Sequence, residues 1–302
     1  MELLAKSAPF DSSPACLKFT SRLWQHWPVL LLSLVVLLLY LPVLVRLIGQ
    51  WSADPNYSHG FFVPVLTGYL IWRKRGELAG CPVQPSAAGT GCVLLSLGLL
   101  VLGTLGAELF LQRISLWLTI VGLLLYFLGW PKLRIMLFPI AFLLFMIPLP
   151  TIIYNEIVFP LQLLTSRFAT GCLQVANIVP VAREGNLLVL PTSTLEVAEA
   201  CSGIRSLISL LAFAFGYGYL VEPNLAVRIA LGLATIPVAI VSNAARLIIT
   251  ALMVYYVSPR SAEGLPHALS SYVIVMIAAI LLLIVHAALA WTQRELRAKA
   301  TR

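Results

Sequence analysis

Long apolar runs are the feature of this sequence that most restricts what the chain can fold into. A helix that crosses the hydrocarbon layer of a membrane needs about 20 predominantly apolar residues. Residues 27–45, 88–107, 203–221 and 268–291 form four such runs, and Arg205 is the only charged residue in them. The composition agrees, because 60% of the residues are hydrophobic and 11% are charged, against about 25% charged in an ordinary soluble domain. The sequence therefore predicts a polytopic membrane protein.

Four weaker segments bring the expected number of membrane spans to about eight. Residues 114–130 and 135–150 are separated by Pro131, Lys132 and Arg134, which predict a tight helical hairpin at a membrane surface. Residues 57–72 are the weakest candidate. Residues 229–257 exceed the length of one span and contain Pro237, so we expect this seventh helix to be kinked or broken.

The expected fold class is therefore an all-α polytopic membrane protein with one transmembrane domain over residues 27–291. Residues 1–26 precede this domain, and residues 292–302 form a basic tail. The first apolar run is too long for a removable signal peptide, and its flanks do not resemble a cleavage site. We expect it to stay in the membrane.

The distribution of basic residues predicts the orientation. The net charge of +8 is not gathered into one aromatic-rich patch, so we expect the lipid bilayer, and no nucleic acid, as a partner. Of the 20 Lys and Arg residues, 13 fall on the side of the two termini and 7 on the other side. Because positively charged connections stay in the cytoplasm, both termini are predicted to be cytoplasmic.

Residues 151–200 then face outward and are too long for a structureless linker. Residues 152–177 space their apolar residues as a helix does. This helix is expected to lie along the membrane interface, or to enter it as a partial re-entrant segment. Residues 179–183 and 187–190 flank Glu184, Gly185 and Asn186, a glycine-containing loop that predicts a small β-hairpin. A helix and a hairpin should thus precede the sixth span.

Cys201 comes directly before the sixth span, at the predicted N-terminus of its helix. Unpaired backbone N–H groups and the helix dipole lower the pKa of a thiol there and favour a reactive thiolate. Arg205, one turn further on, adds to the positive field. The five cysteines show no CxxC or other metal-ligand spacing, so we expect neither a metal nor a cofactor.

The topology brings two more residues to the depth of Cys201. Arg246 lies far along a helix that starts on the inner side, and an arginine within a span is by default a functional candidate. His267 opens the last span from the same outer side. Asn243, one turn before Arg246, adds polarity, and His59 is the other outward-facing histidine.

A thiolate, an imidazole and a guanidinium supply a nucleophile, a proton carrier and an oxyanion stabiliser, which are the parts that acyl transfer needs. Two alternatives remain open. A broken seventh helix with Asn243 and Arg246 would also suit a transporter or a lipid-linked glycan export factor. A non-catalytic assembly scaffold is the third interpretation.

Five motifs occur in order along the chain: Tyr57-Ser58-His59-Gly60, Arg183-Glu184-Gly185-Asn186, Ala200-Cys201-Ser202-Gly203-Ile204-Arg205, Asn243-Ala244-Ala245-Arg246 and His267. In this combination they resemble the motifs of the exosortases. The resemblance implies a cysteine protease-transpeptidase of the bacterial inner membrane, with its active site facing the periplasm. Its substrates would be exported proteins whose C-terminal sorting tail has a Pro-Glu-Pro type motif, a hydrophobic helix and a basic cluster. By this resemblance Cys201 forms a thioester, His267 transfers protons and Arg246 stabilises charge.

Overall fold

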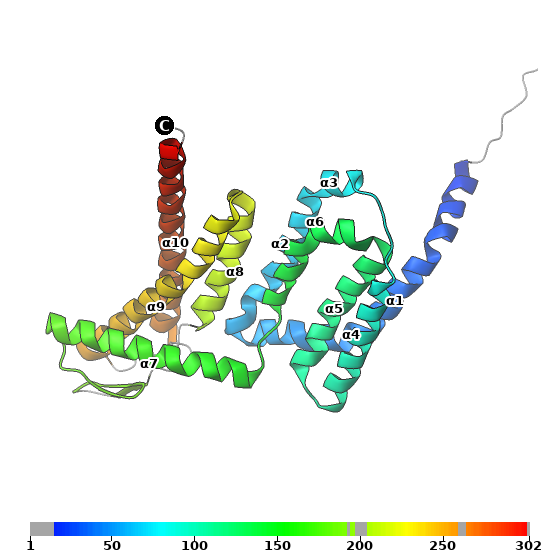
Figure 1. Ribbon diagram of the computed structural model, residues 1–302. Coiled ribbons are helices and arrows are strands. Elements are labelled where there is room, and N and C mark those ends of the chain that lie inside the picture. The colour runs from blue at the N-terminus through cyan, green and yellow to red at the C-terminus, as the bar shows by residue number, and fades with distance from the viewer. Residues whose placement is uncertain (1–14, 192–193, 197–203, 259–263, 301–302) are drawn as a thin grey trace, which may run out of the picture. The chain divides into compact units, whose positions relative to one another are not determined.

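The computed structural model describes residues 15–191, 194–196, 204–258 and 264–300, which are mostly helical (Figure 1). Residues 1–47 and 48–302 form two compact units. The first half of the chain contains α1 (Ala15–Ala53), η1 (Pro55–Phe61), α2 (Phe62–Arg73), α3 (Arg75–Gly80), α4 (Ala88–Leu105), α5 (Leu109–Phe127), α6 (Gly129–Phe142) and η2 (Leu143–Met146), where η denotes a 3₁₀-helix. The second half contains α7 (Thr151–Ala176), β1 (Ala182–Glu184), β2 (Leu187–Val189), β3 (Thr194–Glu196), α8 (Ile204–Val221), α9 (Leu225–Tyr256) and α10 (Gly264–Ala300).

Six helical segments in the described part of the chain are long and apolar enough to cross a membrane. They are Trp27–Ala53, Ala88–Leu105, Leu109–Phe127, Gly129–Met146, Leu225–Tyr256 and Val273–Glu295. Many of their large apolar side chains are exposed, as expected for surfaces that face lipid rather than water. The other two expected spans are α2, which has 12 residues, and α8, which has 18 residues from Ile204 to Val221. The protein is therefore a multi-pass membrane protein, and its described residues contain six candidate spans.

Two helix boundaries differ from expectation. The α5–α6 hairpin exists, but its turn precedes Gly129, so Pro131, Lys132 and Arg134 lie inside α6. Proline is tolerated in the first turn of a helix because the N–H groups there have no intrahelical partner. The expected break in the seventh span is absent, since α9 continues through Pro237 for 32 residues. One missing backbone hydrogen bond does not interrupt a helix whose other backbone groups have no water to bind.

The insertion before the sixth span has the expected helix and hairpin, with one further strand. The helix α7 ends at Ala176, where Asn177 adopts the left-handed conformation that terminates helices. Strands β1 and β2 pair antiparallel around Gly185, whose φ of +64° suits the tight turn. Strand β3 adds to β2 and gives a three-stranded sheet in the order β1-β2-β3. The predicted hairpin was correct but incomplete.

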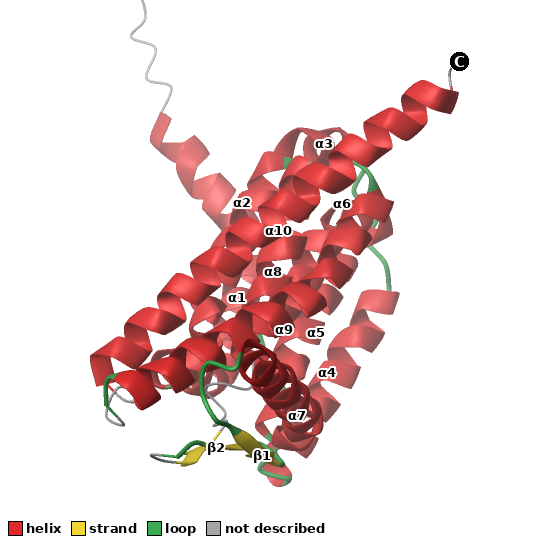
Figure 2. Ribbon diagram, turned by 90° about the vertical axis from the view of Figure 1, so that its left-hand side faces the viewer, coloured by secondary structure: helices red, strands yellow, loops and turns green. Residues whose placement is uncertain are grey.

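The last three helices form the group that positions the candidate site. Helices α8 and α9 are antiparallel neighbours joined by a short turn, and α10 packs against α9. Ala214, Leu231 and Leu282, one from each helix, pack in a single buried cluster. Helix α7 lies crosswise to this group, at the end where α8 begins and α9 ends, and the sheet lies beside it (Figures 1 and 2).

Candidate active site

The C-terminal half of α9 carries a buried polar face. Ser242, Asn243, Arg246 and Thr250 recur at helical spacing, and each side chain is at most 4% exposed. Arg246 therefore lies inside the protein rather than in the lipid or on the surface. An arginine buried in this way has lost its hydration, so its charge acts strongly on nearby groups.

Helix α7 presents a second polar face to α9. Gln162, Thr165, Ser166 and Thr170 are all buried and share one side of the helix. The amide Nδ2 of Asn243 donates a hydrogen bond to Oγ1 of Thr165 at 3.4 Å. We call these four buried polar residues of α7, together with the four of α9, the α7–α9 seam. Sequence reasoning missed Thr165, although the helical spacing of the polar residues from 162 to 170 was a usable signal.

The other side of α7 is exposed and mixed in character. Phe159 and Phe168 are about half exposed, and the charged side chains of Glu156 and Arg167 share this exposed surface. Apolar and charged groups together on one exposed face are typical of a helix at a membrane interface. The expected interfacial helix is consistent with this pattern, and its polar inner face is what joins it to α9.

The sheet is held against α7 and α9 by both polar and apolar contacts. The hydroxyl of Ser166 donates to the carbonyl of Gly185 in the β1–β2 turn at 3.1 Å. Leu247 and Ala251 of α9 pack in one cluster with Leu173 of α7 and Leu188 of β2. The sheet thus covers the part of α9 that directly follows Arg246.

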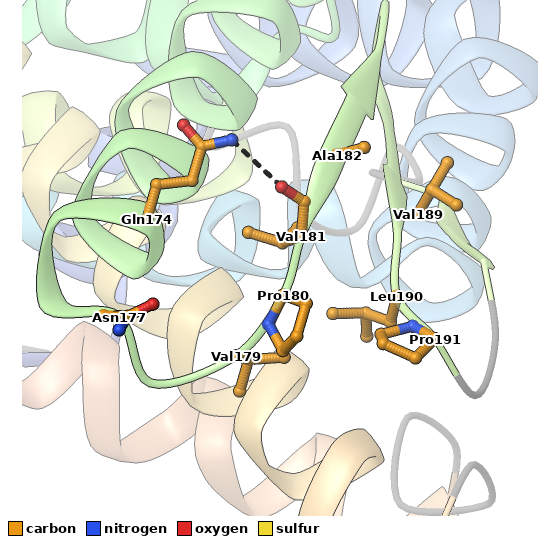
Figure 3. A pocket seen from close by; sticks show the side chains of 9 residues that line it. All are labelled: Gln174, Asn177, Val179, Pro180, Val181, Ala182, Val189, Leu190 and Pro191. Atoms are coloured by element: carbon orange, nitrogen blue, oxygen red, sulfur yellow. Dashed lines mark hydrogen bonds between the residues drawn. The ribbon is translucent and has the colours of Figure 1, made fainter.

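A shallow pocket of about 490 Å³ opens between the end of α7 and the sheet. The side-chain amide of Gln174 donates to the carbonyl of Val181 at 3.0 Å and fixes one wall (Figure 3). Pro180, Leu190 and Pro191 give the pocket a largely apolar lining. Its walls continue into the cluster that packs on α9.

His59 is held between two segments that are distant in sequence. Its Nε2 lies 3.1 Å from the carbonyl oxygen of Phe145 in η2, and its Nδ1 lies 3.4 Å from Oγ of Ser209 in α8. Burial of the ring lowers the pKa of His59, while hydrogen bonds with the backbone of Phe145 and Asn56 partly oppose that shift. His59 therefore contacts the first half of α8, the helix that follows Cys201.

The next residue, Gly60, allows η1 to pack closely. The indole of Trp51 lies against Gly60, and its Nε1 donates to the carbonyl of Met146 at 3.0 Å. The Tyr57–Gly60 motif thus joins η1 to η2, and through His59 to α8.

Among the sequence-predicted residues, the structure brings Asn243 and Arg246 onto one buried face and directs His59 to α8. Cys201 lies outside the described residues, three positions before the start of α8. His267 and Arg205 lie in the first turns of α10 and α8, and only their backbone is described. In the part of the chain that the structure describes, no group of three metal-ligating side chains occurs.

A family comparison identifies the chain. The family model of the transmembrane exosortases matches residues 51–284. The chain belongs to the exosortase family. The matched region of this exosortase contains all six candidate residues, from His59 to His267, and exosortases are membrane transpeptidases. No curated protein and no solved structure matches the chain.

Proposed function

We propose that this exosortase is a cysteine protease-transpeptidase that removes C-terminal sorting tails from exported proteins at the outer face of the inner membrane. Cys201 is the nucleophile, His267 transfers protons and Arg246 stabilises the charged intermediate. Asn243, Arg205 and His59 support these groups. The observation that carries the proposal is the register of α8, α9 and α10.

Counting along the helices supports a common depth for the three residues. Ala214, Leu231 and Leu282 mark one level, since they pack in one cluster. Cys201 precedes Ala214 by 13 positions, Arg246 follows Leu231 by 15, and His267 precedes Leu282 by 15. Because α9 runs opposite to α8 and α10, all three counts lead toward the same end (Figure 1). At about 1.5 Å per residue the counts along α9 and α10 each correspond to about 23 Å. Helix α8 begins at Ile204, 10 positions or about 15 Å before Ala214, and Cys201 precedes that start by three positions.

The burial of Arg246 supports a role in charge stabilisation. A guanidinium supplies several fixed N–H donors, and fixed donors in a dry site stabilise a developing oxyanion more than water does. Asn243 orients the same face of α9 through its hydrogen bond to Thr165. The α7–α9 seam would therefore hold Arg246 in place before the substrate arrives.

In the proposed reaction, the thiolate of Cys201 attacks the carbonyl carbon of the scissile peptide bond. The resulting oxyanion is stabilised by Arg246. The C–N bond then breaks, the leaving amine takes a proton from His267, and a thioester remains on Cys201. An acceptor amine, or water, attacks the thioester and gives its proton to His267. The C–S bond breaks, which releases the product and restores the thiolate of Cys201 beside a protonated His267.

The orientation and the number of spans belong to the same proposal. Both termini lie in the cytoplasm, and α2 and α8 complete eight crossings. A substrate whose basic cluster is held in the cytoplasm then presents its cleavage motif at the level of Cys201. The transporter alternative depended on a broken seventh helix, and α9 continues without a break from Leu225 to Tyr256.

The test is removal of the tail from a secreted reporter that carries a sorting tail and is co-expressed with the protein. Cys201→Ala should reduce tail removal to background, because no other group replaces the thiolate. Cys172→Ala is the matched control, since Cys172 is an exposed cysteine of α7. It should process the reporter like the unaltered protein.

The comparison of tail removal requires that each variant is present in the membrane at the same level as the unaltered protein. Normal processing by Cys201→Ala, at an unchanged membrane level, would refute the nucleophile assignment.

A further inference from the structure

A second polar pocket lies at the other end of the α8–α9 hairpin from the α7–α9 seam. It has a volume of about 360 Å³ and is lined by the end of α2, by α3, by the last turn of α8 and by the first turn of α9. Its charged residues are Arg73, Lys74, Glu77 and Arg228, and Tyr219 also lines it. Three cations and one carboxylate give the pocket a net positive charge, and we call it the basic pocket.

The aromatic ring of Tyr219 contacts two of the three cations. The guanidinium carbon of Arg228 lies 4.8 Å, and Nζ of Lys74 lies 5.6 Å, from the centroid of the Tyr219 ring. Phe138 stacks on the same ring at a centroid distance of 3.8 Å, so the ring is held rigidly. Cations placed over an aromatic ring keep their charge while they lose part of their hydration.

Among the described residues, the hydrogen bonds of the two arginines use only a few of their donors. Nη1 of Arg73 donates to the carbonyl of Leu220 at 3.3 Å, and Nε of Arg228 donates to the carbonyl of Glu222 at 2.5 Å. Capping the C-terminus of α8 thus uses one nitrogen of each guanidinium, and a guanidinium has five N–H donors. A helix end that needed only capping would not require both arginines and a lysine.

Lys74 remains charged in this setting. Partial burial opposes its charge, but interactions with Tyr219 and with Glu77 outweigh the burial and raise the pKa of Lys74 above its ordinary 10.5. Glu77 lies 3.6 Å from Nζ of Lys74, but its side chain is 63% exposed. An exposed carboxylate neutralises the pocket only weakly, because water screens it.

Aromatic side chains place the basic pocket at the level of lipid headgroups. Trp72 is 58% exposed and Tyr69 is 47% exposed, directly beside the pocket residues of α2. The guanidinium of Arg75 lies over Trp72, 4.2 Å from its ring. Exposed Trp and Tyr next to basic residues are typical of the membrane–water interface.

We propose that the basic pocket binds the phosphate group of an anionic glycerophospholipid. Phosphate accepts the forked N–H donors of arginine, and basic pockets between transmembrane helices suit anionic headgroups. A free phosphate shares this chemistry, but the exposed Trp72 and Tyr69 favour a ligand that continues into the bilayer. The bound headgroup connects the α2–α3 end to the α8–α9 turn. This inference does not depend on the protease assignment.

The test is lipid binding to the purified full-length protein in neutral detergent, followed by native mass spectrometry. Phosphatidylglycerol should bind, whereas phosphatidylcholine and soluble glycerol 3-phosphate should bind at least tenfold more weakly. Each cation near a headgroup contributes about 1 kcal/mol, which corresponds to about a fivefold change in affinity. Lys74→Gln and Arg228→Gln should therefore each weaken phosphatidylglycerol binding about fivefold, and together about 25-fold.

Arg75→Gln is the matched control, because Arg75 is in the same segment but does not line the pocket. It should bind phosphatidylglycerol like the unaltered protein. Equal affinity in all variants would overturn the site, and equal binding of glycerol 3-phosphate and phosphatidylglycerol would overturn the lipid assignment. If Arg228→Gln does not fold, Lys74→Gln tests the same pocket, since the partly exposed Lys74 bonds to no backbone carbonyl of the described residues.

Discussion

Replacing Gly60 with alanine should destabilise the protein by an amount that the structure sets. A Cβ atom at this position would lie 2.4 Å from Nε1 of Trp51 and 2.6 Å from two other ring atoms. Non-bonded heavy atoms need about 3.5 Å, so the indole would have to retreat by about 1 Å. Trp51 is only 7% exposed and its ring lies edge-on to Phe61, which leaves little room for that movement.

The retreat has two costs. It would stretch the 3.0 Å hydrogen bond from Nε1 of Trp51 to the carbonyl of Met146 beyond hydrogen-bonding distance. A lost hydrogen bond costs about 0.5–1.5 kcal/mol, and overpacking of a well-packed site costs about 1–3 kcal/mol. We therefore expect Gly60→Ala to lower the free energy of unfolding by about 2–4 kcal/mol.

The measurement is unfolding of the purified protein in detergent, by denaturant titration. Gly68→Ala is the matched control, because a Cβ atom at Gly68, inside α2, meets no atom within 4 Å. That variant should gain about 0.5–1 kcal/mol, since glycine inside a helix is destabilising. If Gly60→Ala were as stable as Gly68→Ala, the close approach of Trp51 would be refuted, and with it the rigid placement of His59.

Two further predictions concern the polar contacts of the site. A double-mutant cycle with Asn243→Leu and Thr165→Val should give a coupling free energy of about 0.6–1.7 kcal/mol, as for other hydrogen bonds between membrane helices, and a coupling near zero would contradict their contact. Because burial lowers the pKa of His59 in the folded protein, the unfolded chain binds more protons just below pH 6.5. Stability should therefore fall as the pH is lowered through 6.5, and His59→Gln should flatten that dependence; an unchanged pH profile would argue against a buried, neutral imidazole.

The parts of the fold that depend on local chemistry could be predicted from the sequence. Apolar length alone marked three of the six candidate spans, those that begin at Trp27, Ala88 and Val273. The hairpin followed from Gly185 between two short apolar runs. Strand β3 was missed because Thr194–Glu196 is three residues long and has no pattern of its own. It forms by pairing with β2, which is a tertiary event.

Proline was the least reliable guide to helix boundaries here. Pro131 was expected to separate two helices and Pro237 to kink or break one, yet Pro131 lies in the first turn of α6 and α9 continues through Pro237 without a break. In water a helix that loses one hydrogen bond can exchange it for a bond to solvent, so proline often ends it. In a bilayer the neighbouring backbone groups have no such exchange, so the helix continues.

The candidate site was only partly visible in the sequence. Asn243 and Arg246 stood out because a polar group within an apolar run costs free energy, so it occurs mainly where it has a function. Thr165 did not stand out, because a threonine is tolerated almost anywhere in a helix. Its importance comes from the packing of α7 on α9, and no local pattern specifies which helix a given face will meet.

The crosswise position of α7 connects these observations. Its polar residues face α9 and its mixed surface faces outward, the reverse of a helix on a water-soluble protein. Apolar and charged groups together on one exposed face suit a helix at the membrane boundary, which is where the sequence predicts α7 to lie. Arg246 is only 4% exposed, so the surrounding protein atoms keep water from its guanidinium. A charge stabilised by that guanidinium experiences a lower dielectric than at an open surface, and the interaction is correspondingly stronger. Helix α7 and the sheet pack on the half of α9 that carries Arg246. We therefore expect the insertion to contribute to the electrostatic environment of that guanidinium.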